Sequence, residues 1–381
     1  MAERAASGAG AAALNPRELR RYSRHLLIPE VGLTGQKKLT ASRVLVIGAG
    51  GLGSPALQYL AAAGVGRIGV MDDDVVDETN LQRQTIFSEA DVGANKAQAA
   101  SARLRAINSQ VNVDSIPLRF GDGNARELVR LYDVVLDCTD RFASRYLIND
   151  ACYLERRPDV YGSIFRFDGQ VSVFGLPEQP CYRCLYPQPP PLERQPSCAE
   201  GGVLGALAGI VGTWQAGEAL KLLLGIGEPL AGRLLLIDTL TARMREVLFD
   251  RDQQCELCGD NASIVQAIEE GTDELPSQSP VFEIEAEQLE AALRDAVMLD
   301  VREPHEAVLG CIPGAIQIPA SQLEARMSEL DSARRYVVAC RVGAKSLWAV
   351  RRLQDAGFTR LQHLRGGLLA YAAGHGEFAF F

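Results

Sequence analysis

The sequence lacks a surplus of positive charge, and this absence argues against one large class of function. Its 381 residues include 39 Lys and Arg against 48 Asp and Glu, which gives a formal net charge of −9 at pH 7. A protein that binds DNA or RNA needs lysine and arginine to neutralise phosphates, and no basic stripe offsets the acidic balance here. We therefore expect no direct contact with nucleic acid.

The sequence also lacks a clear membrane-spanning segment or secretory signal. Residues 201–217 carry no charge, but they are rich in glycine, and Glu218 and Lys221 follow them directly. A membrane span needs about 20 predominantly apolar residues, so this stretch predicts a buried helix instead. The first 15 residues are rich in Ala and Gly but lack a cleavage pattern. We predict a cytosolic protein with no membrane contact, in which residues 1–16 are a disordered lead-in.

Cysteine, by contrast, is not scarce, since the chain has nine. In a cytosolic protein this number indicates metal binding or catalysis rather than disulfides. Cys181-x-x-Cys184 and Cys255-x-x-Cys258 form two pairs separated by 70 residues. One such pair alone could be a redox site, but two pairs have the four-thiolate pattern of structural zinc. We therefore predict that Cys181, Cys184, Cys255 and Cys258 bind zinc.

A glycine-rich segment is the first motif that indicates catalysis. Gly48-Ala49-Gly50-Gly51-Leu52-Gly53 follows the apolar run Val44–Ile47 and precedes the apolar stretch Ala56–Ala63. Glycines let the backbone approach a phosphate closely, and the start of a helix offers unpaired N–H groups. Asp72 lies about 20 residues further on, where an acid can hydrogen-bond a ribose. The segment predicts a nucleotide site, although a glycine pattern alone does not identify the nucleotide.

The residues that follow favour ATP over a nicotinamide dinucleotide. The run Thr79–Gln84, which contains Arg83, is followed by Lys96 and later by Asp137-Cys138-Thr139-Asp140. Two cations and a late acid suit the charge that develops on a triphosphate and its metal, whereas hydride transfer does not need them. Asp140 is predicted to hold magnesium, and it can also cap the helix that follows it. The prediction is an adenylating enzyme, with an NAD-dependent reductase fused to a sulfurtransferase as the alternative.

The spacing of apolar runs predicts an α/β protein with two domains. The first, residues 17–260, alternates strands and helices in the manner of a mostly parallel Rossmann-like sheet, which places ligands at the carboxyl ends of its strands. Residues 261–280 are polar and acidic and predict a linker, and residues 281–381 restart an α/β pattern. The principal predicted elements are Val44–Ile47, Pro55–Ala63, Gly69–Asp72, Lys96–Asn108, Val111–Ile116, Val134–Cys138, Leu234–Ile237, Met244–Leu248, Val297–Val301, Tyr336–Ala339 and Ala344–Ala356.

Two cysteines stand apart from the zinc pairs in polar surroundings. Cys198 lies in Ser197-Cys198-Ala199-Glu200-Gly201-Gly202, a polar turn that predicts a nucleophilic or resolving thiol. Cys340 follows the strand Tyr336–Ala339 and opens a loop that leads into a helix. Backbone N–H groups of that loop, Arg341 and Lys345 would favour a thiolate or persulfide at Cys340, although a buried inert cysteine is the alternative. Cys138 and Cys152 lie in apolar runs and are predicted to be core thiols.

On these motifs, residues 17–260 resemble the ubiquitin-activating-enzyme-like superfamily, in the MoeB/ThiF branch that activates small sulfur-carrier proteins. Residues 281–381 resemble a rhodanese domain. The fusion of the two resembles the adenylyltransferase–sulfurtransferase proteins of molybdopterin synthesis and tRNA thiolation. The motifs that carry the resemblance are Arg21-Tyr-Ser-Arg24, Gly48–Gly53, Thr79–Gln84, Lys96, Asp137–Asp140, Cys181-Tyr-Arg-Cys184, Cys198–Gly202, Asp300-Val-Arg302, Ile312-Pro-Gly-Ala315, the Cys340 loop and Gly366-Gly367.

The resemblance implies a role for each site residue. Arg24 would act across a homodimer, Cys198 would be the thiol beside the activated carboxylate, and Cys340 would carry the persulfide. The implied protein partner is a ubiquitin-like sulfur carrier with a C-terminal diglycine. A cysteine desulfurase or thiosulfate would donate the sulfur. The residues implied to bind ATP with magnesium are Gly51, Asp72, Thr79, Asn80, Leu81, Gln82, Arg83, Lys96, Asp140 and Arg141.

Three positions depart from the family pattern. Arg141 stands where the family often has Asn, which puts one nucleotide contact in doubt, and Thr79 replaces the usual Ser. Cys311 replaces the His of the usual Gly-His-Ile-Pro-Gly-Ala, which puts the geometry of that loop in doubt. A further alternative is that the second domain is a rhodanese that serves only for docking. The intact Cys340 loop argues against that alternative.

Overall fold

The computed structural model describes residues 14–189, 202–268, 280–308 and 310–374. The chain forms two compact units. Unit 1 contains the described residues up to 268, and unit 2 contains those from 280 onward. Both have the predicted α/β fold with mostly parallel strands. Within the described ranges, no helix is both long enough and apolar enough to cross a membrane.

Unit 1 is built on an eight-stranded sheet with the order β3-β2-β1-β4-β5-β6-β7-β8. The strands β1 to β5 run parallel, whereas β6, β7 and β8 continue the sheet as antiparallel strands. The hairpin of β5 and β6 is absent from the sequence-based prediction. The strands are β1 (Arg43–Ile47), β2 (Arg67–Met71), β3 (Asn112–Ile116), β4 (Val134–Asp137), β5 (Asp159–Phe165), β6 (Asp168–Phe174), β7 (Arg233–Asp238) and β8 (Arg243–Leu248).

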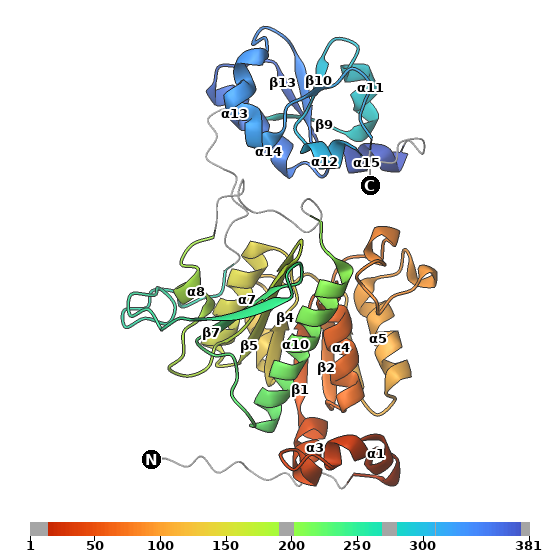
Figure 1. Ribbon diagram of the computed structural model, residues 1–381, viewed down its shortest axis with the longest axis vertical. Helices are drawn as coiled ribbons and strands as arrows, with labels where there is room; N and C mark the ends of the chain where they lie inside the picture. The colour runs from red at the N-terminus through yellow and green to blue at the C-terminus, as the bar shows by residue number, and fades with distance from the viewer. Residues whose placement is uncertain (1–13, 190–201, 269–279, 309, 375–381) are drawn as a thin grey trace. The chain divides into compact units, whose positions relative to one another are not determined.

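Helices cover both faces of this sheet (Figure 1). Alternate residues of β1 show the division: Val44 and Val46 pack with α4, α5 and α10, whereas Leu45 and Ile47 pack with α6 and α7. Short 3-10 turns, η1 (Glu78–Asn80) and η2 (Glu89–Asp91), follow β2. The helices are α1 (Pro16–Arg21), α2 (Ser23–Leu26), α3 (Gly32–Ala41), α4 (Gly53–Ala63), α5 (Lys96–Ile107), α6 (Ala125–Arg130), α7 (Phe142–Leu154), α8 (Tyr182–Leu185) and α10 (Gly205–Leu224).

The helix α10 corresponds to the helix predicted from the uncharged stretch, but it is not wholly buried. Leu207 and Val211 face the core, whereas Ile210 is 40% exposed. The helix packs closely on α4 because its contact face is made of small residues. A Cβ atom on Gly212 would lie 2.2 Å from the Leu52 carbonyl oxygen, so only glycine fits there.

The first three helices pack at the amino edge of the sheet. The Tyr22 hydroxyl accepts a hydrogen bond from the Asn108 amide at 2.9 Å, at the end of α5. The Gln36 amide donates to the Ala63 carbonyl at 2.9 Å, at the end of α4. Since α4 and α5 both run from the carboxyl edge of the parallel sheet back to its amino edge, α1, α2 and α3 lie far from the starts of these helices.

Unit 2 has a five-stranded, all-parallel sheet with the order β11-β10-β12-β13-β9. The strand that carries Asp300 was predicted to be the first of this domain, but β9 precedes it and lies at the far edge of the sheet. Helices α11 (Leu289–Ala292), α12 (Pro304–Ala307), α13 (Leu323–Arg326) and α14 (Ala344–Asp355) connect the strands, and α15 (Gly367–Gly374) follows the last of them. The strands are β9 (Phe282–Ile284), β10 (Val297–Asp300), β11 (Ile316–Gln317), β12 (Tyr336–Ala339) and β13 (Leu361–Leu364).

The predicted boundaries of the domains stay predictions, and two observations bear on them. Residues 1–13 of the predicted lead-in lie outside the described residues. Part of the predicted linker, in contrast, packs against unit 1, because Ala267 is buried beside Phe120 and Leu147, and Ile264 packs beside the cysteine cluster.

Asp159, at the start of β5, is buried in the core of unit 1 with only 2% of its surface exposed. Burial, with a smaller contribution from the nearby Asp137, raises the pKa of Asp159 well above its ordinary value. The folded state thus binds a proton more tightly than the unfolded state. This contribution to stability is complete below the unfolded pKa of about 3.9 and is lost as the pH rises through the folded value.

We therefore expect Asp159→Asn to raise the melting temperature at pH 7 by a few degrees, since each unit of pKa shift is worth about 1.4 kcal/mol. The gain should disappear near pH 4. Thermal unfolding at both pH values checks this, with the exposed Asp168→Asn as the matched control. Equal melting temperatures for Asp159→Asn and wild type at pH 7 would contradict the expectation.

Candidate active sites

The glycine-rich loop joins the end of β1 to the start of α4 and has no room for side chains. Gly48 has a φ of +96°, and a Cβ atom there would lie 2.7 Å from the Cys138 carbonyl oxygen. A Cβ atom on Gly53 would lie 2.0 Å from the Gly48 carbonyl oxygen. The backbone therefore turns tightly at the carboxyl edge of the sheet and presents the first N–H groups of α4, as a phosphate site requires.

Asp72 follows β2 directly and ties the acidic turn to this loop. Its carboxylate accepts hydrogen bonds from the Ala49 N–H at 2.8 Å and from the Asp74 N–H at 3.0 Å. Burial raises the pKa of Asp72 despite these two bonds. The side chain is thus held beside the glycine loop, at the position predicted for a ribose contact.

Two predicted cations lie at the same edge. The Lys96 ammonium, whose side chain is 8% exposed, contacts the Asp74 carboxylate at 2.5 Å. Burial opposes ionisation of Asp74, but its bond to Lys96 and the charge of Arg141 outweigh burial and lower its pKa. Arg83 lies beside the loop, because a Cβ atom on Gly51 would be 3.6 Å from the Arg83 Cγ atom. One ion pair, between Lys96 and Asp74, and the cationic side chain of Arg83 therefore lie at the edge of the sheet that carries the glycine loop.

The run from Thr79 to Arg83 is held by internal hydrogen bonds and contacts the start of α10. The Thr79 hydroxyl and N–H both donate to the Asp77 carboxylate, at 2.5 and 2.8 Å, and the Arg83 guanidinium donates to the Thr79 carbonyl at 3.0 Å. A Cβ atom on Gly205 would lie 2.2 Å from the Gln82 carbonyl oxygen, so the first residue of α10 contacts this run directly. The side chains of Asn80 and Leu81 are half-buried.

The predicted acidic residues of this region lie at the carboxyl end of β4: Asp137 is its last residue, and Asp140 follows three residues later. Asp137 is buried, and its carboxylate accepts from the Thr139 N–H and hydroxyl at 2.9 and 2.6 Å. Asp140 is exposed, and it does not cap α7, whose N-cap residue is Arg141 without a side-chain hydrogen bond. The helix-capping alternative is therefore wrong. An exposed carboxylate is a donor that magnesium prefers, so the chemistry of Asp140 fits the predicted metal role.

Two buried polar residues near this edge are absent from the sequence-based prediction. The Gln215 amide donates to the carbonyls of Asp137 and Val160 at 2.7 and 2.9 Å, and so joins the last residue of β4 and the beginning of β5 to α10. The Arg145 guanidinium is buried with its carbon 5.6 Å from the centre of the Tyr161 ring. A side-chain amide within the uncharged stretch 201–217 was the signal for Gln215; the sequence offered none for Arg145.

The four paired cysteines converge in unit 1. Their sulfur atoms all lie within 4.8 Å of one another, with Cys181 3.6 Å from Cys255 and Cys184 3.2 Å from Cys258. Four thiolates around a tetrahedral zinc at 2.3 Å would be ~3.8 Å apart, so the donor set and its spacing fit zinc. This cluster of Cys181, Cys184, Cys255 and Cys258 joins α8 to the segment after β8.

Buried polar contacts connect the cysteine cluster to α7. Arg183, between the first two cysteines, forms an ion pair with Asp150 at 2.7 Å, and both side chains are at most 3% exposed. The Tyr182 N–H donates to the Asn149 side chain at 2.8 Å. Since α7 begins just after Asp140, the cluster braces the helix that follows the predicted metal ligand.

Arg24 and Cys198 are not part of the described site. Arg24 is exposed on α2, at the amino edge of the sheet, whereas the glycine loop lies at the carboxyl edge. A side chain at one edge does not reach the other within the same unit. Cys198 lies outside the described residues, between Pro189 and Gly202.

In unit 2, Cys340 directly follows β12 and is fully buried beneath its own loop. Its sulfur accepts from the Gly343 N–H at 3.1 Å and lies 3.5 Å from the Ser346 hydroxyl. Gly343 has a φ of +104°, which aims its N–H back at the sulfur. Lys345, a predicted contributor to the charge at the sulfur, forms an ion pair with Glu306 at 2.9 Å instead. Backbone and hydroxyl donors therefore favour a sulfur anion here.

The other predicted motifs of unit 2 support this loop. A Cβ atom on Gly367 would lie 2.5 Å from the Cys340 carbonyl oxygen, so the Gly366-Gly367 turn packs directly under the cysteine. Arg302 is buried, pairs with Asp300 at 2.7 Å and donates to the Gly310 carbonyl at 2.7 Å. Cys311, which replaces the usual His, is exposed.

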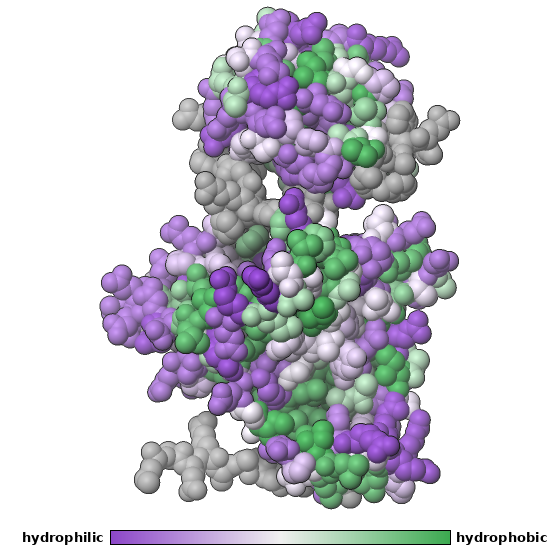
Figure 2. All heavy atoms as spheres, viewed as in Figure 1, coloured by the Kyte–Doolittle hydropathy of each residue, from purple (hydrophilic) through white to green (hydrophobic). Residues whose placement is uncertain are grey.

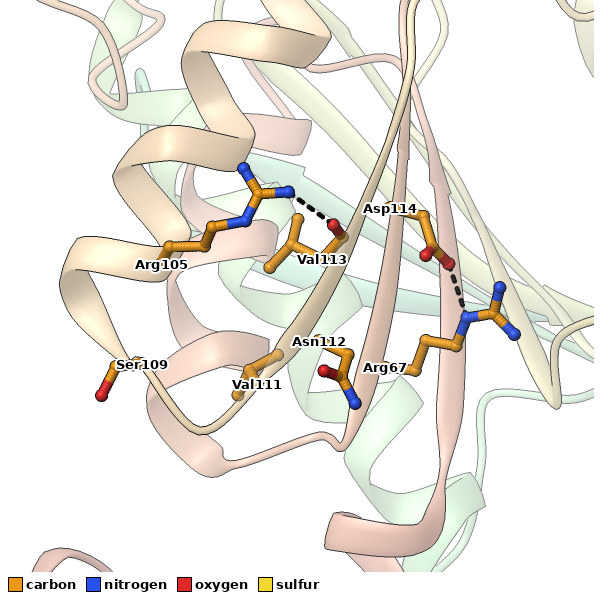
Figure 3. Close-up of a pocket in the computed structure, with 7 residues that line it drawn as sticks. All are labelled: Arg67, Arg105, Ser109, Val111, Asn112, Val113 and Asp114. Atoms are coloured by element: carbon orange, nitrogen blue, oxygen red, sulfur yellow. Dashed lines mark hydrogen bonds and ion pairs between the residues drawn. The ribbon is translucent and has the colours of Figure 1, made fainter.

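A pocket of about 750 Å³ lies away from both sites, at the edge strand β3 (Figure 3). The charged side chains that line it have partners within the protein: Arg67 pairs with Asp114 at 2.6 Å, and Arg105 donates to the Val113 carbonyl at 2.7 Å. No predicted site residue lines this pocket. By capping a carbonyl of the edge strand, Arg105 protects that strand from pairing with another chain.

Comparison with protein families assigns both units. Residues 22–257 match the model of the ThiF family. The chain belongs to the ThiF family. Residues 285–373 match the rhodanese-like domain. The family of this chain is therefore the one that the sequence motifs predicted for its first unit, followed by the predicted rhodanese domain.

Relatives of this ThiF-family chain share its two-part organisation. The probable adenylyltransferase/sulfurtransferase MoeZ of Mycobacterium tuberculosis is 45% identical over 373 residues, which are 95% of each chain. The adenylyltransferase and sulfurtransferase MOCS3 of Arabidopsis thaliana is 40% identical, covering 94% of this chain and 84% of its own. The chain is therefore an adenylyltransferase and sulfurtransferase, and the reductase alternative is wrong.

Two further comparisons concern unit 1 alone. The sulfur carrier protein adenylyltransferase of Thermus thermophilus is 52% identical over 248 residues, which are 64% of this chain and 92% of its own. Among solved structures, E. coli MccB with AMPCPP and MccA matches with a TM-score of 0.57 at 24% identity, over 64% of this chain and 75% of that one. This structural likeness shows the fold only.

Proposed function

We propose that this enzyme adenylates the C-terminal glycine of a ubiquitin-like sulfur carrier and then converts it to a thiocarboxylate. The observation that carries the proposal is that one chain holds both a phosphate-type loop among paired charges and a cysteine whose sulfur is surrounded by hydrogen-bond donors. Relatives named for both activities support it, as does the Thermus relative named for a sulfur carrier.

The first step requires the carboxylate of the carrier to attack the α-phosphate of ATP and to expel pyrophosphate. Lys96 and Arg83 would neutralise the charge that grows on the phosphates. Asp140 would hold magnesium, which when bound supplies further charge neutralisation. The remaining ATP contacts proposed are those of Gly51, Asp72, Thr79, Asn80, Leu81, Gln82 and Arg141.

In the second step a persulfide on Cys340 attacks the acyl adenylate, and AMP leaves. The carrier is then joined to Cys340 through an acyl disulfide. Cys198 attacks the Cys340 sulfur, which releases the carrier thiocarboxylate and leaves a disulfide between the two cysteines for a cellular thiol to reduce. This chemistry and the zinc thiolates both require a reducing compartment, which supports a cytosolic location.

An exposed apolar patch of Phe167, Leu204 and Leu240 supports a folded protein as substrate. These side chains are 40%, 45% and 70% exposed. Backbone hydrogen bonds join their loops: the Leu204 N–H donates to Arg166 at 3.0 Å, and the Thr239 N–H donates to Phe167 at 3.0 Å. Apolar side chains gathered from three loops are typical of a surface that docks a partner.

Self-association would complete the first site. Leu33, Tyr59 and Ile210, on α3, α4 and α10, are 49%, 56% and 40% exposed. Apolar surface lies over α10 and α3 in Figure 2. A homodimer through this face would bury it, and would let Arg24, which does not reach the glycine loop of its own unit, contact ATP on the partner.

Mixing two inactive variants tests the role of Arg24 across a dimer. Arg24→Ala and Lys96→Met should each lose most adenylation, since each removes a cation from the site. If Arg24 acts on the partner subunit, random exchange of subunits should restore about a quarter of wild-type activity, because half of the dimers are mixed and each has one intact site. Adenylate formation measured before and after mixing checks this. No restoration after proven subunit exchange would place Arg24 in its own site or outside any site.

Intact-mass spectrometry of candidate carriers tests the proposed function as a whole. Each carrier is incubated with the enzyme, ATP, magnesium and either thiosulfate or a cysteine desulfurase with cysteine. Replacement of one oxygen by sulfur on a diglycine carrier supports the proposal, and the carrier that reacts assigns the pathway to molybdopterin synthesis or tRNA thiolation. A carrier found only as its adenylate would favour the alternative in which the rhodanese domain serves for docking.

A further inference from the structure

His363 is a buried residue that the mechanism above does not use. It lies on β13 with 5% of its side chain exposed. Its Nδ1 atom is 3.2 Å from the Glu283 carboxylate, on the neighbouring strand β9, and its Nε2 atom is 3.0 Å from the Gly343 carbonyl oxygen. A carbonyl only accepts hydrogen bonds, so the Nε2 atom carries a hydrogen and donates it to Gly343. Glu283 anchors the other side of the ring.

Three donors compete for this one carbonyl. The Leu347 N–H, in the first turn of α14, lies 3.0 Å from the Gly343 oxygen, and the Ser346 hydroxyl oxygen also lies 3.0 Å from it. With His363 there are three donors for an oxygen that has two lone pairs. The Leu347 N–H and the His363 N–H are sufficient to fill both.

The Ser346 hydroxyl has an alternative acceptor, the Cys340 sulfur at 3.5 Å. It has a single proton, so it cannot serve the Gly343 carbonyl and the sulfur together. Ser346 is fully buried, which removes water as a further partner. The choice between the two acceptors therefore depends on whether the carbonyl is already saturated.

We propose that His363 is a positioning residue for sulfur transfer: by saturating the Gly343 carbonyl, it directs the Ser346 hydroxyl proton onto the Cys340 sulfur. The sulfur then has two donors, the Gly343 N–H and the Ser346 O–H, instead of one. Without His363 the serine proton turns to the carbonyl, and the anion loses a donor. This inference rests on the proposed role of Cys340 as the persulfide carrier.

The charged groups around the loop are engaged elsewhere, which isolates the effect of His363. Lys345 on the loop pairs with Glu306 of α12 at 2.9 Å, and Arg302 after β10 pairs with Asp300 at 2.7 Å. Arg341 on the loop has partners of its own. The described charged group in contact with His363 is Glu283 of β9.

The test compares four variants of the full-length enzyme with wild type: His363→Leu, His363→Gln, Ser346→Ala and the double variant His363→Leu/Ser346→Ala. The first measurement is the pH profile of kcat/KM for sulfur transfer from thiosulfate to cyanide. The second is the pH profile of iodoacetamide alkylation at Cys340, resolved by peptide mass spectrometry, which needs no sulfur donor. Thermal unfolding verifies that each variant is folded.

We expect His363→Leu to lower kcat/KM about tenfold near neutral pH, because a sulfur anion loses one donor, and to recover toward high pH. Its alkylation profile should move to higher pH by a similar amount. His363→Gln, which keeps an N–H donor, should stay within about twofold of wild type. In the Ser346→Ala background, His363→Leu should cause no further change, since the competing proton is already absent.

Several results would overturn the proposal. An equal effect of His363→Leu with and without Ser346 would show that His363 acts only through packing. Unchanged profiles for His363→Leu would show that it has no role at the sulfur. If wild type transfers no sulfur in a Cys340-dependent way, the proposed function fails, while the alkylation profiles still decide the role of His363.

Discussion

Replacement of Cys340 by alanine should abolish thiocarboxylate formation while carrier adenylate continues to form and accumulates. Cys340 carries the persulfide in the proposed reaction, and its loop leaves no second sulfur at that position. Removal of a catalytic nucleophile lowers rates by factors on the order of 10⁴ to 10⁶, so the residual sulfur transfer should be undetectable. The adenylation site lies in unit 1 and keeps all its residues.

Intact-mass spectrometry of a reactive carrier distinguishes the two steps directly, because adenylate and thiocarboxylate differ in mass. The matched control is Cys311→Ala, which removes an exposed cysteine of the same unit and should leave both steps unchanged. Thiocarboxylate formed at a normal rate by Cys340→Ala would show that the sulfur enters by another route and that unit 2 serves for docking. Loss of both steps would indicate that the adenylate forms only with unit 2 intact.

Loss of the predicted zinc site should have the second large effect, on the stability of unit 1. Structural zinc sites in small peptides contribute about 10–16 kcal/mol of apparent binding free energy. When a larger domain loses its zinc, part of this free energy is lost from the stability of the folded state. Cys258→Ser removes one ligand, from a position 2% exposed and 3.2 Å from the Cys184 sulfur. We expect loss of bound zinc and a melting temperature lower by ten degrees or more, on the order of several kcal/mol.

The rate of adenylation should fall when zinc is lost, although none of the four cysteines belongs to the predicted nucleotide site. The cluster braces α8, and α8 holds α7 through the buried pair of Arg183 and Asp150. Since α7 begins just after Asp140, a loosened α7 would move the predicted metal ligand. Metal analysis, thermal unfolding and adenylate formation test this together, with the exposed Cys311→Ser as the control. Full zinc content and an unchanged melting temperature in Cys258→Ser would contradict a four-cysteine zinc site.

Features that depend on short segments of the chain were predictable from the sequence. The strand Val44–Ile47, the glycine loop and the helix after it form one local unit, because apolar periodicity and glycine both act on neighbouring residues. The paired cysteines carry their ligand spacing within four residues of chain. Cys340 was recognisable in the same way, since the residues that surround its sulfur, Gly343 and Ser346, lie within the next six positions.

Other features required the packing of distant segments. The β5–β6 hairpin was missed because its strands contain glycine and polar residues, and its pairing is decided by burial against β4 and β7. Lys345 was predicted to act on the sulfur but pairs with Glu306, which is 39 residues earlier in the chain. The sequence shows that both charged residues are present, but it does not predict that they form an ion pair with each other.

The sequence by itself determined the family, the two α/β units and the zinc-type cysteine pairs, because these depend on the spacing of residues that are close in the chain. The residues of the two sites stay predictions from the same local patterns. Only the tertiary structure decided that Arg24 lies at the edge opposite the glycine loop, that Gln215 joins β4 to β5, and that His363 contacts the Gly343 carbonyl. These relations join residues 20 to over 50 positions apart. They arise from burial and saturation of hydrogen bonds, which are properties of the packed chain and leave no periodic trace in the sequence.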